Sequence, residues 1–347
     1  MTTWPRAGLP RRVTVYEVGP RDGLQNESAV VPTAVKAELV RRLLAAGLPV
    51  VEVTSFVHPR WVPQLADAEQ LLDELAASGV ETASLPVLVP NERGLDRALA
   101  RGCRRVALFA SATETFARRN LNRGLDSQFA MFEPVARRAL DAGADVRGYL
   151  SMCFGDPWEG EVPLDQVVAA GVRLLELGAT QLSLGDTIGV GTPGQVHALL
   201  ERFAAAGVGV DRLALHAHDT YGQALANAYA ALEAGITTYD ASAGGLGGCP
   251  FAGSATGNLA TEDLLWMLHG LGIATGVDLE AVVGTSAWLA GELGRPSPSA
   301  VVRARTGTST PPSSNPVPSN PVPSNPVPSD PAPSNPTPSG PQQPGPA

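Results

Sequence analysis

Residues 33–55 read TAVKAELVRRLLAAGLPVVEVTS and contain one complete repeat of the predicted fold. Apolar residues recur every three to four positions over 33–46, which predicts an amphipathic helix. Gly47 follows at the position where helices often end in a left-handed residue. Residues 50–55 are rich in β-branched side chains and predict a strand. Because this order of helix, glycine and strand recurs along the chain, the sequence predicts an α/β protein.

Eight strands are predicted before residue 270, and helical segments such as 33–46, 164–177 and 223–234 separate them. The strands are Val13–Val18, Val50–Ser55, Ser84–Val89, Arg105–Ala110, Asp145–Ser151, Gln181–Leu184, Arg212–His216 and Thr237–Asp240. The glycines expected to end helices are Gly47, Gly102, Gly143, Gly178, Gly207 and Gly235. Eight such repeats predict a (β/α)8 TIM barrel. A doubly wound open sheet is the alternative, because a count of strands does not show closure.

The C-terminal part of the chain has a different composition. Helices predicted at 259–271 and 279–293 would complete or cap the barrel as a short helical extension. Beyond residue 305 the motif Ser-Asn-Pro-Val-Pro repeats with a period of five. Such a segment has little apolar surface to bury and cannot sustain a helix or a sheet. We therefore expect a barrel domain over 1–302 and a disordered Pro-rich tail over 303–347.

Composition limits the classes of function. The chain has 347 residues, 44% apolar and 17% charged, which suits a large buried core. A net charge of −9 disfavours nucleic acid as a partner. The scattered cysteines Cys103, Cys153 and Cys249 suggest free thiols in a reducing compartment. No apolar run approaches the length of a membrane span, so we expect a cytoplasmic protein without a membrane partner.

The strongest chemical signal is the sequence His216-Ala217-His218-Asp219. Residues i and i+2 of a strand project to the same face, so both imidazoles would point in one direction as a pair of metal ligands. Two polar residues at a strand end are the simpler interpretation. Asp22 and Asn258 favour the metal, because they too follow predicted strands. The carboxyl ends of barrel strands are where such folds carry their reacting groups.

Other unusual residues occupy the same predicted face. Arg21 and Asp22 follow a Gly-Pro turn, and Glu52 lies inside an apolar strand, where a carboxylate needs a partner; Arg21 is the obvious candidate. Asp186 lies on a Gly-bounded turn and either caps the next helix or contributes to the site. Residues 244–248 read GGLGG before Cys249, which predicts a mobile lid rather than a packed element. A phosphate-binding loop is not indicated, because the Gly-x-Gly-x-x-Gly spacing and the Walker lysine are absent.

Three motifs together resemble a known family. Residues 18–27 (VGPRDGLQNE), 216–223 (HAHDTYGQ) and 244–263 (GGLGGCPFAGSATGNLATED) are similar to the signatures of 3-hydroxy-3-methylglutaryl-CoA lyases. The likeness extends from about residue 13 to about 295. It implies a TIM barrel that cleaves this acyl-CoA to acetyl-CoA and acetoacetate with Mg²⁺ or Mn²⁺. It also implies a homodimer.

The resemblance assigns roles to individual residues. The implied metal ligands are Asp22, His216, His218 and Asn258, a set of oxygen and imidazole donors that favours Mg²⁺ or Mn²⁺ over zinc. The implied catalytic residues are Arg21, Asp22, Glu52, His216 and Cys249. Glu262 matches a position that supports Asn258, and Asp186 lies in a matching stretch. Cys103 and Cys153 are expected to be packing residues.

Three alternatives to this lyase remain open. A lyase for a bulkier 3-hydroxy-3-alkylglutaryl-CoA would share every motif. Condensing enzymes of the same superfamily usually carry Thr-Leu before Arg-Asp-Gly and lack the cysteine loop, whereas this chain has Gly19-Pro20 and Cys249. A catalytically inactive scaffold is opposed by the complete set of site residues.

One further segment has two interpretations. Arg118-Arg119-Asn120-Leu121-Asn122 either contacts the phosphates of CoA or is a solvated basic turn.

Overall fold

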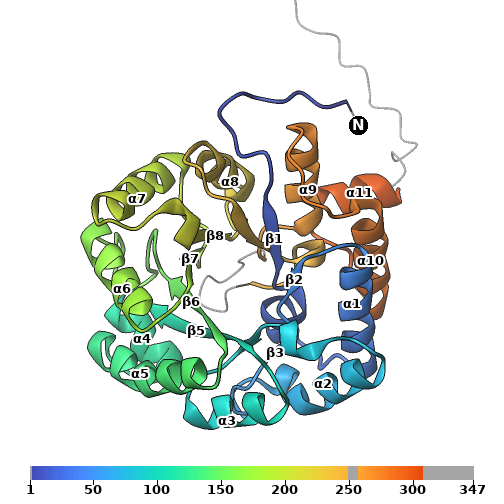
Figure 1. Cartoon of the computed structure of the whole chain (residues 1–347). Helices are drawn as coiled ribbons and strands as arrows, with labels where there is room; N and C mark the ends of the chain where they lie inside the picture. The colour runs from blue at the N-terminus through green and yellow to red at the C-terminus, as the bar shows by residue number, and fades with distance from the viewer. Residues whose placement is uncertain (1, 249–256, 308–347) are drawn as a thin grey trace, which may run out of the picture. The chain divides into compact units, whose positions relative to one another are not determined.

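The computed structural model describes residues 2–248 and 257–307 and is a closed barrel of parallel strands (Figure 1). The predicted second strand is divided into β2 (Val50–Val51) and β3 (Thr54–Ser55). β2 pairs with β1, and β3 pairs with β4 at the other end of the strand order β2-β1-β9-β8-β7-β6-β5-β4-β3. Because β2 and β3 are consecutive in the chain, they join the two edges of the sheet. The TIM-barrel prediction is confirmed, and the open sheet is excluded.

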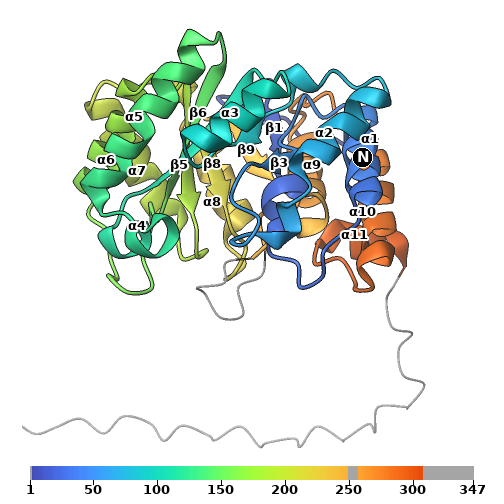
Figure 2. The ribbon, with the colours of Figure 1, turned by 90° about the horizontal axis from the view of Figure 1, so that it is seen from below.

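The helices surround this ring of strands, and Figure 2 shows them from the side. The other strands are β1 (Thr14–Glu17), β4 (Val87–Leu88), β5 (Arg105–Ser111), β6 (Asp145–Ser151), β7 (Gln181–Asp186), β8 (Leu213–Ala217) and β9 (Thr238–Ala241). The helices are α1 (Thr33–Ala45), α2 (Ala68–Ala77), α3 (Glu92–Ala100), α4 (Glu114–Leu121), α5 (Leu125–Asp141), α6 (Leu164–Glu176), α7 (Pro193–Ala205), α8 (Ala224–Glu233), α9 (Thr261–Gly270), α10 (Leu279–Leu293) and α11 (Ala300–Thr306).

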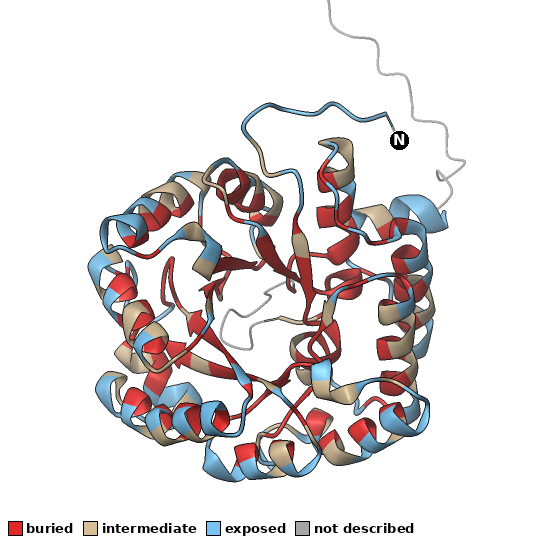
Figure 3. Cartoon of the chain, in the orientation of Figure 1, coloured by how far each residue is buried: buried red, intermediate tan, exposed pale blue. Residues whose placement is uncertain are grey.

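The main apolar core lies between the strands and the inner faces of the helices, whereas the outer helix faces are exposed (Figure 3). The inside of the barrel is different, because several charged side chains are buried there. They are Glu52, Arg147 and Asp240, each at most 5% exposed. Buried charges are costly unless paired, so these side chains indicate a polar centre held by internal hydrogen bonds.

The C-terminal helices follow the predicted extension. α10 has the predicted bounds, and α9 begins two residues later than expected. α11 spans residue 302, where the predicted domain boundary lies. Contacts divide the chain into the units Met1–Thr308 and Ser309–Ala347. Within the described ranges, no helix combines the length and apolarity needed to cross a membrane.

The six glycines expected to end helices all have φ between +73° and +100°. Gly47 is also restricted by a backbone atom, because a Cβ there would lie 2.6 Å from the carbonyl oxygen of Gly276. Gly79 has a similar φ of +85°, but a Cβ there would meet nothing within 4 Å. Comparing substitutions at Gly47 and Gly79 therefore separates the cost of a left-handed backbone from the cost of steric overlap.

We expect Gly47→Ala to destabilise the protein more than Gly79→Ala. The left-handed conformation alone costs a non-glycine residue about 1–2 kcal/mol, which both variants incur. Only Gly47→Ala adds a clash with a backbone atom that cannot rotate away. Urea unfolding monitored by circular dichroism would measure both, and equal losses would refute the steric contribution of Gly276.

Candidate active site

A tight turn at the end of β1 positions Arg21 and Asp22. Residues Gly19–Gly23 form one π-helical turn, in which the N–H of Asp22 donates to the carbonyl oxygen of Val18 at 2.7 Å. Gly23 is required at its position, because a Cβ there would lie 2.8 Å from both Leu246 Cβ and Ser242 Oγ. The turn therefore packs closely against the segment after β9, and this contact presents both charged side chains at the barrel mouth.

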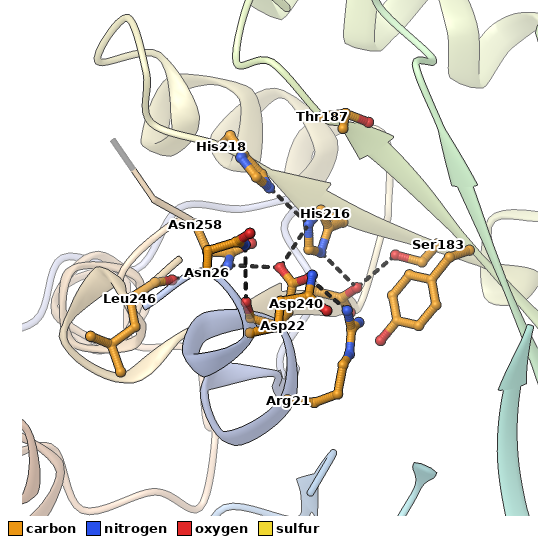
Figure 4. Close-up of polar contacts among 12 residues, drawn as sticks. Arg21, Asp22, Asn26, Ser183, Thr187, His216, His218, Asp240, Leu246 and Asn258 are labelled. Atoms are coloured by element: carbon orange, nitrogen blue, oxygen red, sulfur yellow. Dashed lines mark hydrogen bonds and ion pairs between the residues drawn. The ribbon is translucent and has the colours of Figure 1, made fainter. Parts of the chain in front are cut away.

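Asp22, His216 and His218 converge at this mouth (Figure 4). His216 lies in β8, and His218 follows directly after the strand, so both rings face the same side as expected. Their Nε2 atoms are 3.1 Å apart, and Asp22 Oδ2 is 3.9 Å from His216 Nε2. One potential ligand atom from each of the three residues lies within 4.8 Å of the others. The three side chains could therefore hold one metal ion.

Asn258 joins the same cluster from a distant part of the chain. Its Nδ2 donates to Asp22 Oδ2 at 2.9 Å and to the carbonyl oxygen of Leu246 at 3.0 Å. Gly247 permits this approach, because its φ is +107° and a Cβ there would lie 2.6 Å from Asn258 Nδ2. Asn258 Oδ1 is buried and accepts no hydrogen bond from the described part of the chain. A buried oxygen with an unused lone pair is what a metal ligand requires.

The charge states of the cluster suit a divalent cation. Burial and the neighbouring His216 lower the pKa of His218 to about 3, so its imidazole is neutral, which is the form that binds metals. Burial alone would raise the pKa of Asp22, but Arg21, His216 and His218 outweigh it and lower the pKa overall. Asp22 is therefore a carboxylate at neutral pH. Two imidazoles, a carboxylate and an amide oxygen make a mostly hard donor set.

Glu52 has the partner that its position in an apolar strand demands. Its carboxylate accepts a hydrogen bond from Arg21 Nε and from the hydroxyls of Tyr149 (2.7 Å) and Tyr16 (3.2 Å). Arg21 also donates from Nη1 to Asp22 at 2.6 Å. The guanidinium therefore bridges Glu52 and Asp22, and these carboxylates raise its pKa despite burial. Arg21 is held as a fixed positive charge beside the metal cluster.

Sequence reasoning missed Asp240, whose Oδ2 lies 3.2 Å from His216 Nδ1. Arg147 donates to the same carboxylate from two nitrogens, at 2.6 and 3.2 Å. Asp240 is the last residue of the predicted strand Thr237–Asp240, so the available signal was a charged residue at the carboxyl end of a barrel strand. Burial alone would raise the pKa of Asp240, but Arg147 and His216 lower it overall.

A cavity of about 530 Å³ opens above these side chains. Its polar floor includes Arg21, Asp22, Tyr149, His216 and His218. Its apolar wall includes residues from the loop after β3, from β4 and β5 and from α4 and α5: Val57, Leu88, Phe109, Phe116 and Met131. Its rim includes Trp61, Arg119, Asn120 and Asn122, so part of the predicted basic turn lines this cavity. The volume is sufficient for a small-molecule ligand.

The glycine run before Cys249 departs from the expectation of a wholly mobile lid. Gly244 and Gly245 are buried in a short turn, η5 (Ala243–Gly245), with φ of +68° and +69°. Both oxygens of Glu262 accept the N–H of Gly244 at 3.0 Å, and burial raises the pKa of Glu262 to about 8. These two glycines are therefore packed. Glycine is needed at both positions because it adopts this left-handed conformation without strain. Cys249 lies outside the described residues, although its neighbour Gly248 lines the cavity.

The other candidates have structural partners. Asp186 accepts hydrogen bonds from the N–H groups of Val190 and Gly191, both at 3.0 Å, and so stabilises the turn before α7. Burial raises its pKa to about 6. Cys103 and Cys153 are buried, as expected for packing residues, and burial raises the pKa of both thiols.

Comparisons with known proteins show which family this chain resembles. A family model described as HMGL-like matches residues 12–288. The mitochondrial hydroxymethylglutaryl-CoA lyase of Arabidopsis thaliana is 49% identical, over 84% of this chain and 62% of that protein. Its Rattus norvegicus counterpart is 47% identical, over 85% of this chain and 90% of that protein. Some relatives are named as mitochondrial and others as cytoplasmic.

Solved structures give the same result. The crystal structure of hydroxymethylglutaryl-CoA lyase from Pseudomonas aeruginosa has a TM-score of 0.82 and 44% identity to this chain, and the match covers 86% of this chain and 99% of that one. These matches cover most of the chain, including the whole barrel. The chain therefore belongs to the HMGL-like family.

Proposed function

We propose that this protein cleaves 3-hydroxy-3-methylglutaryl-CoA to acetyl-CoA and acetoacetate. The observation that carries the proposal is the convergence of Asp22, His216 and His218 at the cavity floor of an HMGL-like barrel. The reaction removes the proton of the substrate's 3-hydroxyl group and breaks the bond between C2 and C3. Acetoacetate leaves, and the acetyl-CoA fragment departs as an enolate that must take up a proton at C2.

The proposed metal ligands are Asp22, His216, His218 and Asn258, and the proposed ion is Mg²⁺ or Mn²⁺. Asn258 Oδ1, which accepts no hydrogen bond from residues 2–248 or 257–307, and the neutral His218 support this assignment. When bound, a divalent cation polarises substrate oxygens and lowers the pKa of a hydroxyl group. Two oxygen donors and two imidazoles, with no thiolate among these four residues, favour Mg²⁺ or Mn²⁺ over zinc.

The side chains of this chain divide the remaining tasks. Asp22 or His216 accepts the hydroxyl proton, and both lie at the cavity floor. Arg21 stabilises the negative charge that develops on the thioester oxygen. Glu52 keeps Arg21 in position through the Nε hydrogen bond, supported by the hydroxyls of Tyr16 and Tyr149. A fixed guanidinium is effective here because it need not reorganise during the reaction.

Two further groups complete the proposal. Cys249 donates the proton that the enolate carbon needs, a role that rests on the family resemblance and on the position of Gly248 in the cavity wall. Arg119, Asn120 and Asn122 line the cavity rim and contact the phosphates of CoA. Arg118 is less suited to that task, because it is paired with Glu114 at 2.6 Å.

A bulkier 3-hydroxy-3-alkylglutaryl-CoA is the alternative substrate, because the cavity wall contains Leu88, Phe109, Phe116 and Met131 and could accept a longer alkyl group. Assays of both thioesters under the same conditions would distinguish them. A higher kcat/KM for the 3-methyl compound supports the main proposal. A higher value for the longer chain would assign the protein to the alternative.

We expect metal removal to abolish acetoacetate release. Dialysis against a chelator should remove the activity, and added Mg²⁺ or Mn²⁺ should restore it, because the three clustered side chains cannot by themselves lower the pKa of the tertiary alcohol enough. An enzyme-coupled assay for acetoacetate measures both steps, and the metal content of each sample is the control. Full activity in metal-free protein would contradict the proposal.

The remaining family expectations belong to the same proposal. We expect a homodimer located in the cytoplasm, acting in leucine breakdown or ketone-body formation. A separate tail whose composition opposes folding is proposed for residues 309–347, because residues 303–306 belong to α11 and the first unit ends at Thr308. Sedimentation equilibrium of the full chain would test the dimer.

A further inference from the structure

We propose that Asp240 and Arg147 form a buried support that fixes which ring nitrogen of His216 faces the metal. The inference rests on the metal site of the proposed function but concerns two residues to which no role has been assigned. Neither is a proposed metal ligand. Both act through His216, so they are positioning residues.

The first step concerns the contact between Asp240 and His216. Asp240 lies in β9, is 1% exposed and places Oδ2 at 3.2 Å from His216 Nδ1 (Figure 4). The same oxygen accepts the hydroxyl of Ser183 at 2.7 Å. An ionised carboxylate can only accept hydrogen bonds, so the proton of His216 must be on Nδ1. Nε2 is then the ring nitrogen that faces the cluster, 3.1 Å from His218 Nε2 and 3.9 Å from Asp22 Oδ2.

The second step concerns the charge of Asp240. Arg147 binds this carboxylate with two parallel donors, the geometry in which arginine and carboxylate interact most strongly. Arg147 is 5% exposed, and its guanidinium lies 3.9 Å from the ring centroid of Tyr16 and 4.8 Å from that of Tyr149. Its Nε also donates to Gln181 at 3.2 Å. Asp240, Gln181 and the two tyrosine rings thus hold the cation in place beside the Asp240 carboxylate.

The third step connects this support to the other half of the site. Tyr16 and Tyr149, which stack on Arg147, donate their hydroxyls to Glu52, which holds Arg21. One continuous polar layer inside the barrel therefore orients both the metal-facing histidine and the guanidinium beside it. Partners of metal-binding histidines typically change metal affinity about 10–100-fold when removed.

The main test measures Mn²⁺ affinity of the metal-free full chain by the EPR signal of unbound Mn²⁺, without any thioester. Asp240→Asn should weaken binding about 10–100-fold, because the amide can donate to Nδ1 and favour the wrong tautomer. Arg147→Met should weaken it in the same direction. Arg147 also lines a cavity of about 310 Å³ at the opposite end of the barrel. In Arg147→Met, water from this cavity can therefore reach the Asp240 carboxylate, which has lost its guanidinium partner.

A matched control is available in Lys36→Met. Lys36 is 1% exposed and pairs with Asp67 at 2.7 Å, so this variant also removes a buried cation from a carboxylate, but outside the cavity. It should lower stability and leave Mn²⁺ affinity unchanged. Thermal unfolding of each variant corrects for the folded fraction. Wild-type Mn²⁺ affinity in folded Asp240→Asn, or an equal loss in Lys36→Met, would overturn the proposal.

A second measurement uses the unmutated protein. In ¹⁵N-histidine-labelled metal-free protein, the ring nitrogens of His216 should show the tautomer protonated at Nδ1, and the opposite tautomer would overturn the proposal even if Asp240→Asn failed to fold. Both tests are independent of turnover. If the wild type binds Mn²⁺ but does not cleave 3-hydroxy-3-methylglutaryl-CoA, the proposed function fails while the support can still be judged. A wild type that binds no Mn²⁺ would refute both the metal site and its support.

Discussion

Asp22→Asn is expected to lower turnover of 3-hydroxy-3-methylglutaryl-CoA by roughly 10²–10⁴, the range for a positioned acid or base. Metal affinity should fall at the same time. The reason is that Asp22 is the carboxylate of the cluster, with Oδ2 at 3.9 Å from His216 Nε2. The amide cannot supply the negative charge that a divalent cation needs beside two neutral imidazoles.

The shape of the site should survive this substitution. An amide can still accept hydrogen bonds from Arg21 and Gln25, which now reach Asp22 Oδ1 at 2.6 and 2.9 Å. Any loss of turnover therefore reports the missing charge together with the hydrogen bond that Asn258 Nδ2 now donates to Asp22 Oδ2. Acetoacetate release and Mn²⁺ affinity are the two readouts.

Asp156→Asn provides the matched control. Asp156 is 4% exposed and accepts hydrogen bonds from Thr113 and from two backbone N–H groups, so it is a buried carboxylate with a structural task. It does not line the cavity. This variant should lose stability while keeping metal affinity. If Asp22→Asn bound metal and turned over normally, Asp22 would be neither ligand nor base.

The fold was largely predictable because its signals are local. Apolar periodicity, β-branched runs and glycine after each helix depend on neighbouring residues, and the strand Asp145–Ser151 was predicted with its exact bounds. The division of the second strand into β2 and β3 was not predictable. It depends on pairing with β1 on one side and β4 on the other, which is tertiary information.

The site was predictable where chemistry followed strand geometry. His216 and His218 were found because two residues of one strand share a face. Glu52 was found because a carboxylate in an apolar strand needs a partner, and Arg21 is that partner. Asp240 was missed because Arg147 lies 93 residues away in sequence and His216 lies 24 away. No local pattern links these side chains before the barrel closes.

The glycine run shows how composition can mislead. Gly244 and Gly245 read as a flexible stretch, yet both are buried with left-handed backbone. Gly247 serves a different purpose, because it gives Asn258 room to approach Asp22. A glycine in a sequence indicates either a flexible backbone or a position where another atom approaches too closely for a side chain. Only the folded structure distinguishes these two cases.

Cys249→Ala is the second substitution with a large expected effect. Turnover should fall by roughly 10²–10⁴, the usual contribution of a general acid, while Mn²⁺ affinity stays unchanged because Cys249 is not a proposed ligand. A thiol with an ordinary pKa of about 8.5 keeps its proton at neutral pH and can give it to the enolate carbon. Cys249→Ser should be nearly as slow, because an alcohol is a much weaker acid.

The other two cysteines make this test specific. Cys103 and Cys153 are buried, neither lines the cavity, and burial raises the pKa of Cys103 to about 11. Cys103→Ala and Cys153→Ala should therefore affect unfolding more than turnover. Comparing kcat and Mn²⁺ affinity across the three alanine variants separates loss of a proton donor from loss of packing. Undiminished turnover in Cys249→Ala would remove this thiol from the mechanism, and the proton would then have to come from a residue on the cavity floor or from water.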